Sequence, residues 1–333
     1  MKSDPGGKRV PVGVLGMGLM GRSIVTCLLA AGHPVTGITT TASKLTTTRR
    51  QVLALLKELE REGLLKTSPA SVIDRLTVST SYADLAGAEV VIESVIENIE
   101  TKKDLYRRVE EVVSRRCLIG SNTSAIPVSL LQEGLKYPER VLGFHWAEPA
   151  HITRFMEIIC GKQTKPAFAK RALELARGWG KEPSLLKRDI RGFITNRCFY
   201  ALLREAFHLV DSGYATIADV DRSLRNDLGY WITFAGPFRF MDLTGIPAYE
   251  AVTKDLFPEL DNRTSVPELM AKTVKSGARG VSNAKGFYRY TPESAARWEK
   301  LFLKFSYDIR KLAMQYPEDI GDRPVRSRSR KKA

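Results

Sequence analysis

The chain has 333 residues, of which 43% are hydrophobic and 27% are charged. This composition excludes wholesale disorder and a disulfide-stapled scaffold, and the length favours two domains over a single core. No apolar run approaches the ~20 residues of a membrane-spanning helix, and the four cysteines lack metal-ligand spacing, so we expect no membrane, no metal and a cytoplasmic setting. The formal net charge of +15 comes without a nucleic-acid motif, so no nucleic-acid partner is expected either.

The first half of the chain alternates between short apolar strands and amphipathic helices. Strands are expected at residues 12–15, 35–38, 75–79, 89–93, 118–121 and 141–145, and helices at residues 23–31, 51–65 and 102–113. The uninterrupted apolar run before Glu93 is typical of a parallel strand that is buried on both faces. This alternation predicts an α/β domain over residues 9–187, with a Rossmann-type, doubly wound parallel sheet.

After Gly192 the pattern changes to helices alone. The segment from Phe199 to Val210 has one wide apolar face at helical spacing, and further helices are expected at residues 217–225, 248–256, 266–275 and 292–314. We therefore expect an all-helical domain over residues 188–316, with its apolar face buried partly within the domain and partly against a second copy of the chain. The basic tail over residues 317–333 is expected to be disordered.

A glycine-rich loop lies between the first expected strand and the first expected helix. It reads Gly16-Met17-Gly18-Leu19-Met20-Gly21. The first glycine permits a tight turn, the second lets the backbone approach a pyrophosphate, and the third lets helix and strand pack closely. The phosphates would lie at the positive end of the following helix. The loop in this context predicts dinucleotide binding.

The acidic residue that normally follows the second strand and accepts the ribose hydroxyls of NAD is missing. The chain has Thr39 there, followed by two more threonines and then by Lys44. Hydroxyl groups with a nearby cation could accommodate the 2′-phosphate of NADP(H). Alternatively, NAD(H) binds with a weaker bond to Thr39. The sequence leaves both cofactors open.

Further motifs follow the glycine loop in a set order. They are Ile92-Glu93-Ser94-Val95-Ile96-Glu97-Asn98, Ser121-Asn122-Thr123-Ser124, Gly143-Phe144-His145-Trp146-Ala147-Glu148-Pro149, Glu157 and Gly192-Phe193-Ile194-Thr195-Asn196-Arg197. Together they strongly resemble the L-3-hydroxyacyl-CoA dehydrogenase family over about residues 10–290. The resemblance implies an NAD-dependent oxidoreductase of fatty acid metabolism that works as a homodimer.

The resemblance also implies a role for each matching position. His145 corresponds to the catalytic base and Glu157 to the carboxylate that orients it, while Ser124 and Asn196 correspond to residues that hold the substrate oxygens. Glu97 and Lys102 match positions near the nicotinamide end of the cofactor. The chemistry is consistent with these roles, because oxidising a secondary alcohol needs a base for the hydroxyl proton while hydride leaves for the nicotinamide.

Each of these residues also has a structural interpretation when it is taken alone. His145 could be an ordinary buried histidine that follows an apolar strand. Glu157 could occupy a surface position of a strand, and Ser124 and Asn196 could be helix caps. The joint order of the motifs favours the catalytic interpretation, and that step rests on the resemblance.

Some positions depart from the family pattern. Glu148 stands where the family has an asparagine against the cofactor, Ser282 lies where it has a lysine, and Arg191 replaces its proline. The serine and lysine that the family uses on CoA have no counterpart here. Three cations, Arg50, Lys57 and Arg61, nevertheless share one face of the expected helix and could bind the phosphates of CoA.

The substrate therefore stays open between alternatives. The first is an L-3-hydroxyacyl-CoA, which the complete motif set favours. The second is a small free 3-hydroxy carboxylate, because the stretches Asn226–Trp231 and Ala235–Phe238 resemble the branch with L-gulonate 3-dehydrogenase, L-carnitine dehydrogenase and lambda-crystallin. The third is a non-catalytic, crystallin-like dinucleotide-binding protein, against which the retained site residues argue.

Overall fold

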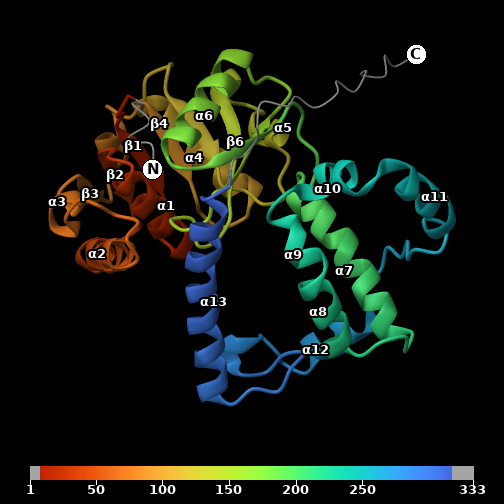
Figure 1. The fold of residues 1–333 in the computed structure, drawn as a ribbon. Coiled ribbons are helices and arrows are strands. Elements are labelled where there is room, and N and C mark those ends of the chain that lie inside the picture. The colour runs from red at the N-terminus through yellow and green to blue at the C-terminus, as the bar shows by residue number, and fades with distance from the viewer. Residues whose placement is uncertain (1–7, 317–333) are drawn as a thin grey trace, which may run out of the picture. The chain divides into compact units, whose positions relative to one another are not determined.

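The computed structural model describes residues 8–316, so the tail over residues 317–333 lies outside the described residues. Two compact units are divided between Leu203 and Arg204 (Figure 1). The domain division at residues 187/188 that we expect from the sequence falls earlier in the chain. The first unit continues beyond it because Phe193 packs its ring against His145, at a centroid distance of 5.4 Å. The domain limits over residues 9–187 and 188–316 stay a prediction.

The first unit contains an eight-stranded sheet in the order β3-β2-β1-β4-β5-β6-β7-β8. All neighbouring strands are parallel except β6 and β7, which are antiparallel. The four central strands β1, β4, β5 and β6 are buried along their whole length, so the sheet is covered on both faces. The fold class predicted from the sequence is confirmed. The strands are β1 (Val12–Leu15), β2 (Val35–Ile38), β3 (Leu76–Ser79), β4 (Val90–Glu93), β5 (Leu118–Ser121), β6 (Val141–Trp146), β7 (Phe155–Cys160) and β8 (Glu182–Leu186).

Helices connect these strands and enclose the core. They are α1 (Leu19–Ala30), α2 (Leu45–Arg61), α3 (Pro69–Ile73), α4 (Ile99–Val112), α5 (Val128–Leu131) and α6 (Pro166–Gly178), and α7 (Thr195–Asp211) begins in this unit. The buried core includes Val91, Ile119 and Val141 from neighbouring central strands. Among residues 8–316, no helix is both long and apolar enough to cross a membrane.

Strand β8 was not expected from the sequence. It contains Pro183, which cannot donate a hydrogen bond to a neighbouring strand. The structure places β8 at the edge of the sheet, where only β7 pairs with it. A proline is tolerated at such an edge, which explains why propensity alone gave no strand here.

The second unit is helical, with only isolated bridges between Gly280, Lys285 and Arg289 among its described residues. Its contacts join distant segments: the hydroxyl of Tyr288 donates to Asp221 at 2.6 Å, and Arg263 pairs with Asp211 at 2.9 Å. The helices that lie wholly in this unit are α8 (Ile217–Asn226), α9 (Leu228–Ile232), α10 (Gly236–Thr244), α11 (Ile246–Leu256), α12 (Glu268–Lys275) and α13 (Pro292–Ala313).

Large apolar side chains lie exposed on several of these helices. Phe238 on α10 is 80% exposed, and Phe302 and Phe305 on α13 are each 61% exposed. The apolar face that the sequence predicts on α7 is likewise only partly covered, and Phe199 is 50% exposed. A single chain therefore leaves much apolar surface in contact with water.

Candidate active site

The glycine loop joins β1 to α1, as the sequence predicts, and each glycine in it has its own constraint. Gly16 has a φ of +89°, which disfavours any side chain. A Cβ on Gly21 would lie 1.8 Å from the carbonyl oxygen of Gly16, so helix and loop touch backbone to backbone. A Cβ on Gly18 would meet no described atom within 4 Å, so it would project into open space in front of the loop. Of the other loop residues, Met17 is buried, Met20 half-buried and Leu19 exposed.

The start of α1 is suited to an anion. No described side chain caps it, and its first turn contains no acidic residue. Its first N–H groups are therefore available to a ligand, and the helix dipole adds partial positive charge. Arg22 brings a cation to the same place, because its Nη1 donates to the carbonyl oxygen of Met17 at 3.0 Å. These residues fit the pyrophosphate of a dinucleotide.

Two positions that flank the loop carry residues other than those usual in a dinucleotide site of the family that the motifs resemble. Thr39 directly follows β2 and is buried, with its N–H bonded to the carbonyl of Ser79 at 2.9 Å. Glu148 follows β6 and is exposed. Partial withdrawal from water raises the pKa of Glu148, although the N–H of Ala150 and the charge of Arg22 act against this rise. A carboxylate is therefore near the cation that lies beside the glycine loop.

A buried polar network, which is not predicted from the sequence, lies at this edge of the sheet. Glu93 ends β4 and uses all its acceptor positions: Oε1 accepts from Lys102 at 2.6 Å and from the N–H of Val95 at 2.7 Å, and Oε2 accepts from Tyr106 at 2.7 Å and from Ser121 at 2.8 Å. The four side chains are fully buried. Burial and the charge of Glu93 raise the pKa of Tyr106 well above its ordinary value, so its hydroxyl stays a donor. The signal in the sequence was an acid at the end of a buried apolar strand, which requires partners.

Glu97 connects this network to the loop that follows β5. Lys102 also reaches Glu97, at 3.3 Å. The Oε1 of Glu97 accepts the hydroxyl of Thr123 and the N–H groups of Ser124 and Ala125, the last two at 3.0 and 3.2 Å. Burial would raise the pKa of Glu97, but the Thr123 hydroxyl and the charge of Lys102 outweigh burial and lower it. Glu97 therefore carries a negative charge beside Ser124 at neutral pH.

His145 and Glu157 form the second part of the site. They are paired directly across β6 and β7, and His145 Nδ1 lies 2.8 Å from Glu157 Oε2. Glu157 is 1% exposed, so the interpretation of this residue as a surface position is wrong. The rings of Phe155 and Phe193 lie against the imidazole, each at a centroid distance of 5.4 Å. Because Nδ1 is held by the carboxylate, Nε2 is the nitrogen that can face a ligand.

Glu157 holds the start of α7 as well. Its Oε1 accepts the N–H groups of Ile194 and Thr195 at 3.1 and 2.9 Å. Burial would raise the pKa of Glu157, but the hydrogen bonds from His145 and Thr195 and the charge of His145 lower it overall. The carboxylate is therefore ionised at neutral pH and accepts a hydrogen bond from the N–H at Nδ1. In the neutral imidazole, Nε2 is then the acceptor nitrogen.

Asn196 and Ser124 complete the group. Helix α7 begins at Thr195, so Asn196 lies inside the helix and is not its cap. Its Nδ2 donates to the carbonyl oxygen of Ser124 at 3.0 Å. Asn122 Oδ1 accepts the N–H of Trp146 at 3.0 Å and so joins the Ser124 loop to the strand of His145. The structure thus gathers His145, Glu157, Ser124, Asn196, Glu97 and Lys102 at the carboxyl edge of β4, β5 and β6.

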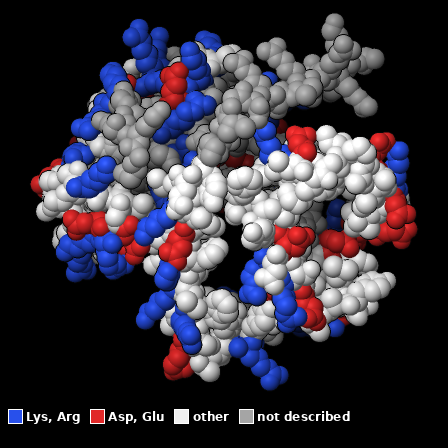
Figure 2. Space-filling view, in the orientation of Figure 1, with Lys and Arg blue, Asp and Glu red and all other residues white. Residues whose placement is uncertain are grey.

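The three cations on α2 are in a different situation. Arg50, Lys57 and Arg61 are exposed, and Figure 2 shows basic side chains gathered over the position of this helix. Among the described residues, no hydrogen bond or ion pair joins them to the site, and Arg61 pairs with Glu62 at 3.8 Å. The described residues also contain no group of three or more potential ligands that could hold a metal ion.

This fold and site define a dinucleotide-binding oxidoreductase, and comparison with known proteins identifies its family. Residues 11–190 match the NAD binding domain of 3-hydroxyacyl-CoA dehydrogenase, and residues 192–290 match the C-terminal domain of the same enzyme family. The chain therefore belongs to the 3-hydroxyacyl-CoA dehydrogenase family, as the motifs predict, and is an oxidoreductase.

Individual relatives differ in their named substrates. A 5-formyl-3-hydroxy-2-methylpyridine 4-carboxylate 5-dehydrogenase from Mesorhizobium japonicum is 32% identical over 85% of this chain and 91% of its own. A crystal structure of such a dehydrogenase, described as an NAD+-dependent dismutase, has a TM-score of 0.86 at 29% identity and covers 93% of this chain and 100% of its own. A 3-hydroxybutyryl-CoA dehydrogenase structure from Ralstonia eutropha has a TM-score of 0.72 at 26% identity. It covers 85% of this chain and 100% of its own.

Proposed function

We propose that the protein interconverts an L-3-hydroxyacyl-CoA and the corresponding 3-ketoacyl-CoA with NAD(H), and that His145 is its general base and acid. One observation carries the proposal. The imidazole of His145 is held through Nδ1 by the buried, ionised Glu157, while Nε2 stays available. This is the arrangement that alcohol oxidation requires, because the base must accept a proton at a fixed position.

This geometry determines the path of the proton. Nε2 of His145 takes the proton of the substrate hydroxyl, and Glu157 stabilises the imidazolium that forms. In the reductive direction, the same nitrogen returns the proton to the carbonyl oxygen. The rings of Phe155 and Phe193 cover the imidazole and keep water from competing for it. The amide of Asn196 and the hydroxyl of Ser124 hold the oxygens of the substrate.

The cofactor would be held by several elements in turn. The loop from Gly16 to Gly21 and the start of α1 would take the pyrophosphate, and Thr39 the adenine ribose. Glu97 would contact the nicotinamide end, the buried Lys102 would hold Glu97 in place, and Glu148 would lie beside the loop. A nicotinamide bound there would supply the acceptor for the hydride that leaves the carbinol carbon. Thr39 in place of an acid leaves room for the 2′-phosphate of NADP(H).

A second candidate substrate is a small free hydroxy carboxylate without CoA. It is favoured by the TM-score of 0.86 to a dehydrogenase named for a pyridine carboxylate. The absence of counterparts for the serine and lysine that the family uses on CoA supports the same alternative.

One assay separates the two. Oxidation of NADH is followed with acetoacetyl-CoA, with the acetoacetyl thioester of N-acetylcysteamine and with free acetoacetate. The main proposal predicts the highest kcat/KM for acetoacetyl-CoA, and a preference for the free acid would replace it with the second candidate. If NADH binds and none of a panel of acyl-CoA esters and free keto acids is reduced, the enzymatic proposal is wrong.

A further inference from the structure

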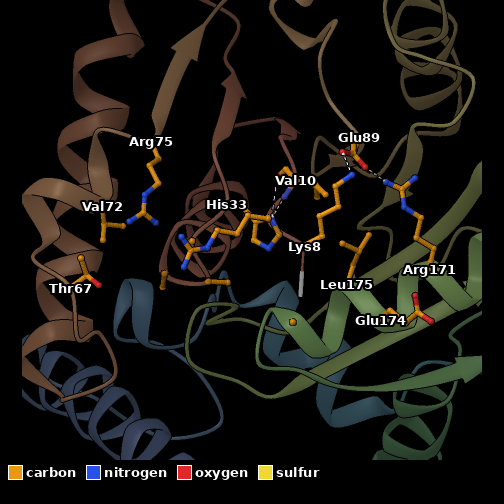
Figure 3. A pocket seen from close by; sticks show the side chains of 15 residues that line it. Lys8, Val10, His33, Thr67, Val72, Arg75, Glu89, Arg171, Glu174 and Leu175 are labelled. Carbon is orange, nitrogen blue, oxygen red and sulfur yellow. Dashed lines mark hydrogen bonds and ion pairs between the residues drawn. The ribbon is translucent and has the colours of Figure 1, made fainter. Parts of the chain in front are cut away.

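A hollow of about 540 Å³ opens on the first unit, away from the candidate active site (Figure 3). Four of the residues that line it, Val10, His33, Arg75 and Glu89, come just before the parallel strands β1 to β4. The hollow therefore lies at the amino edge of the sheet, whereas the glycine loop and His145 lie at the carboxyl edge. Its volume is within the range of about 300–1,000 Å³ that small-molecule sites occupy.

Positive charge in this hollow exceeds the negative charge. Four cations and two acids line it: Lys8, Arg9, Arg75, Arg171, Glu89 and Glu174. Glu89 is shared by Lys8 at 3.4 Å and Arg171 at 2.7 Å, and Glu174 lies 3.9 Å from Lys170 outside the hollow. The guanidinium groups of Arg9 and Arg75 have no acidic partner among residues 8–316. Two guanidinium groups without an acidic side-chain partner among the described residues thus line one cavity.

The side chain of Arg9 lies close to Gly32 in the wall of the hollow. A Cβ on Gly32, which has a φ of +91°, would lie 2.8 Å from Arg9 Nε. His33 next to it is 4% exposed, and its Nδ1 lies 3.1 Å from the N–H of Val10. Burial lowers the pKa of His33, the hydrogen bond to the backbone of Val10 acts against this, and the charge of Arg9 lowers it further. The side chains of Val72 and Leu175 give the hollow an apolar part (Figure 3).

We propose that this hollow binds the phosphomonoester of a small organic molecule. Arg9 and Arg75 would hold the phosphate, because a planar guanidinium matches two phosphate oxygens at once. Val72 and Leu175 would cover the organic part, since the hollow is far larger than a phosphate group. The site differs in location and in residues from the dinucleotide site, and it does not depend on the proposed function.

The arginines have one competing explanation. Helices α1 and α6 end at this hollow, at Ala30 and Gly178, and helix carboxyl ends attract cations. Arg9 and Arg75 could serve only to balance those two ends. In that case their removal would lower the stability of the protein without any ligand, and it would not change the affinity for phosphate.

The test is calorimetric titration of the full chain with phenyl phosphate at pH 8, where the phosphate is a dianion because its second pKa is about 6. Titrations are run with and without NADH. We expect one phenyl phosphate per chain in both, and the double variant Arg9→Gln/Arg75→Gln should raise Kd at least tenfold. The control Arg107→Gln/Arg116→Gln removes the same charge from exposed positions of the first unit and should leave Kd unchanged.

Three results would overturn the proposal. The first is no binding to the unmodified protein. The second is displacement of phenyl phosphate by NADH, which would place the phosphate at the glycine loop. The third is an unchanged Kd in the Arg9→Gln/Arg75→Gln variant, with or without a lower Tm. If that variant is unfolded by circular dichroism, Arg75→Lys, which keeps the charge but loses the planar fork, should raise Kd by a smaller factor, and an unchanged Kd there would count against the proposal.

Discussion

His145 and Glu157 stand directly opposite each other in the register of two antiparallel strands, and their side chains meet at 2.8 Å. The reversal of β7 makes this pairing possible, because opposed residues of an antiparallel pair project to the same face at close distance. A slip of one residue would turn Glu157 to the other face of the sheet and leave two buried polar groups without partners. The geometry of the base is therefore set by the sheet rather than by a loop.

Replacing the histidine tests the base directly. His145→Gln keeps a polar side chain of similar reach but removes the titrating nitrogen. We expect kcat to fall by about two to four orders of magnitude, the usual contribution of a general base, while the Kd for NADH, measured by fluorescence, changes little. Turnover close to that of the unmodified enzyme would rule out His145 as the base.

The carboxylate of Glu157 should make folding stability depend on pH. Its pKa in the folded protein lies below the ordinary value of 4.5. Above pH 4.5 the group is ionised in both states and its full contribution is present. As pH falls toward the folded pKa, only the unfolded chain binds the proton, so stability is lost.

Urea unfolding at pH 7 and pH 4 measures this effect. At pH 7, Glu157→Gln should lower the free energy of unfolding by about 2 kcal/mol, the scale of a hydrogen bond to a buried charge. Between pH 7 and pH 4, the variant should lose less stability than the unmodified protein. Glu60→Gln, at an exposed position of α2, serves as the control and should retain the pH dependence. Identical pH profiles for all three proteins would contradict the prediction.

Cofactor choice should depend on Thr39. We expect the unmodified enzyme to discriminate weakly between NADH and NADPH, because no acid stands after β2 to repel the 2′-phosphate. Thr39→Asp should shift kcat/KM toward NADH, and Thr39→Asn, which has the same size but no charge, should not. The prediction would be contradicted if the unmodified enzyme strongly selects NADH and Thr39→Asp does not change this selectivity.

The exposed apolar side chains on α7, α10 and α13 predict that two copies associate. Residues such as Phe199, Phe238 and Phe302 would bury surface worth about 25 cal/mol per Å² on contact with a second chain. Multi-angle light scattering should give the mass of a dimer over a wide concentration range. Phe302→Lys on α13 should shift the equilibrium toward monomer. A monomer at every concentration of the unmodified protein would disprove the prediction.

The basic face of α2 provides the test for CoA. Reversing Arg50, Lys57 and Arg61 to Glu should raise KM for acetoacetyl-CoA at least tenfold if these cations bind its nucleotide phosphates. The N-acetylcysteamine thioester lacks the nucleotide, so its kinetics should stay the same. Reversal of Lys162, Lys170 and Arg177, exposed cations outside α2, controls for net charge. Unchanged kinetics on both thioesters would favour the free carboxylate substrate.

Much of the first unit was predictable because each signal is local. The glycine loop and the apolar strands are contiguous in sequence, and periodicity reports them directly. The start of α2 was not predictable, because the chain from Thr46 to Thr48 has weak helix propensity. The helix nevertheless begins at Leu45, because packing buries Thr48. The end of α2 also differs from the expected residue 65: the helix ends at Arg61, and Gly63 follows with a φ of +73°.

The site divides in the same way. His145 and Glu157 were found through a motif, yet the burial of Glu157 depends on β8 and on the start of α7, which no local pattern reports. The partners of Glu93 come from α4 and β5, so only the folded sheet brings Tyr106 and Ser121 to it. Residues that are distant in sequence and meet only in three dimensions are the part that sequence reasoning misses.

The three glycines of the loop are required for different reasons. Gly16 and Gly21 are required by the chain itself, because side chains there would strike its own backbone. Gly18 has open space before it, so folding alone would tolerate an alanine at this position. A library of variants selected only for solubility should therefore keep the outer glycines and accept other residues at position 18. A library selected for dinucleotide binding should keep all three glycines, so a glycine retained at position 18 would indicate that the ligand, and not the fold, requires it.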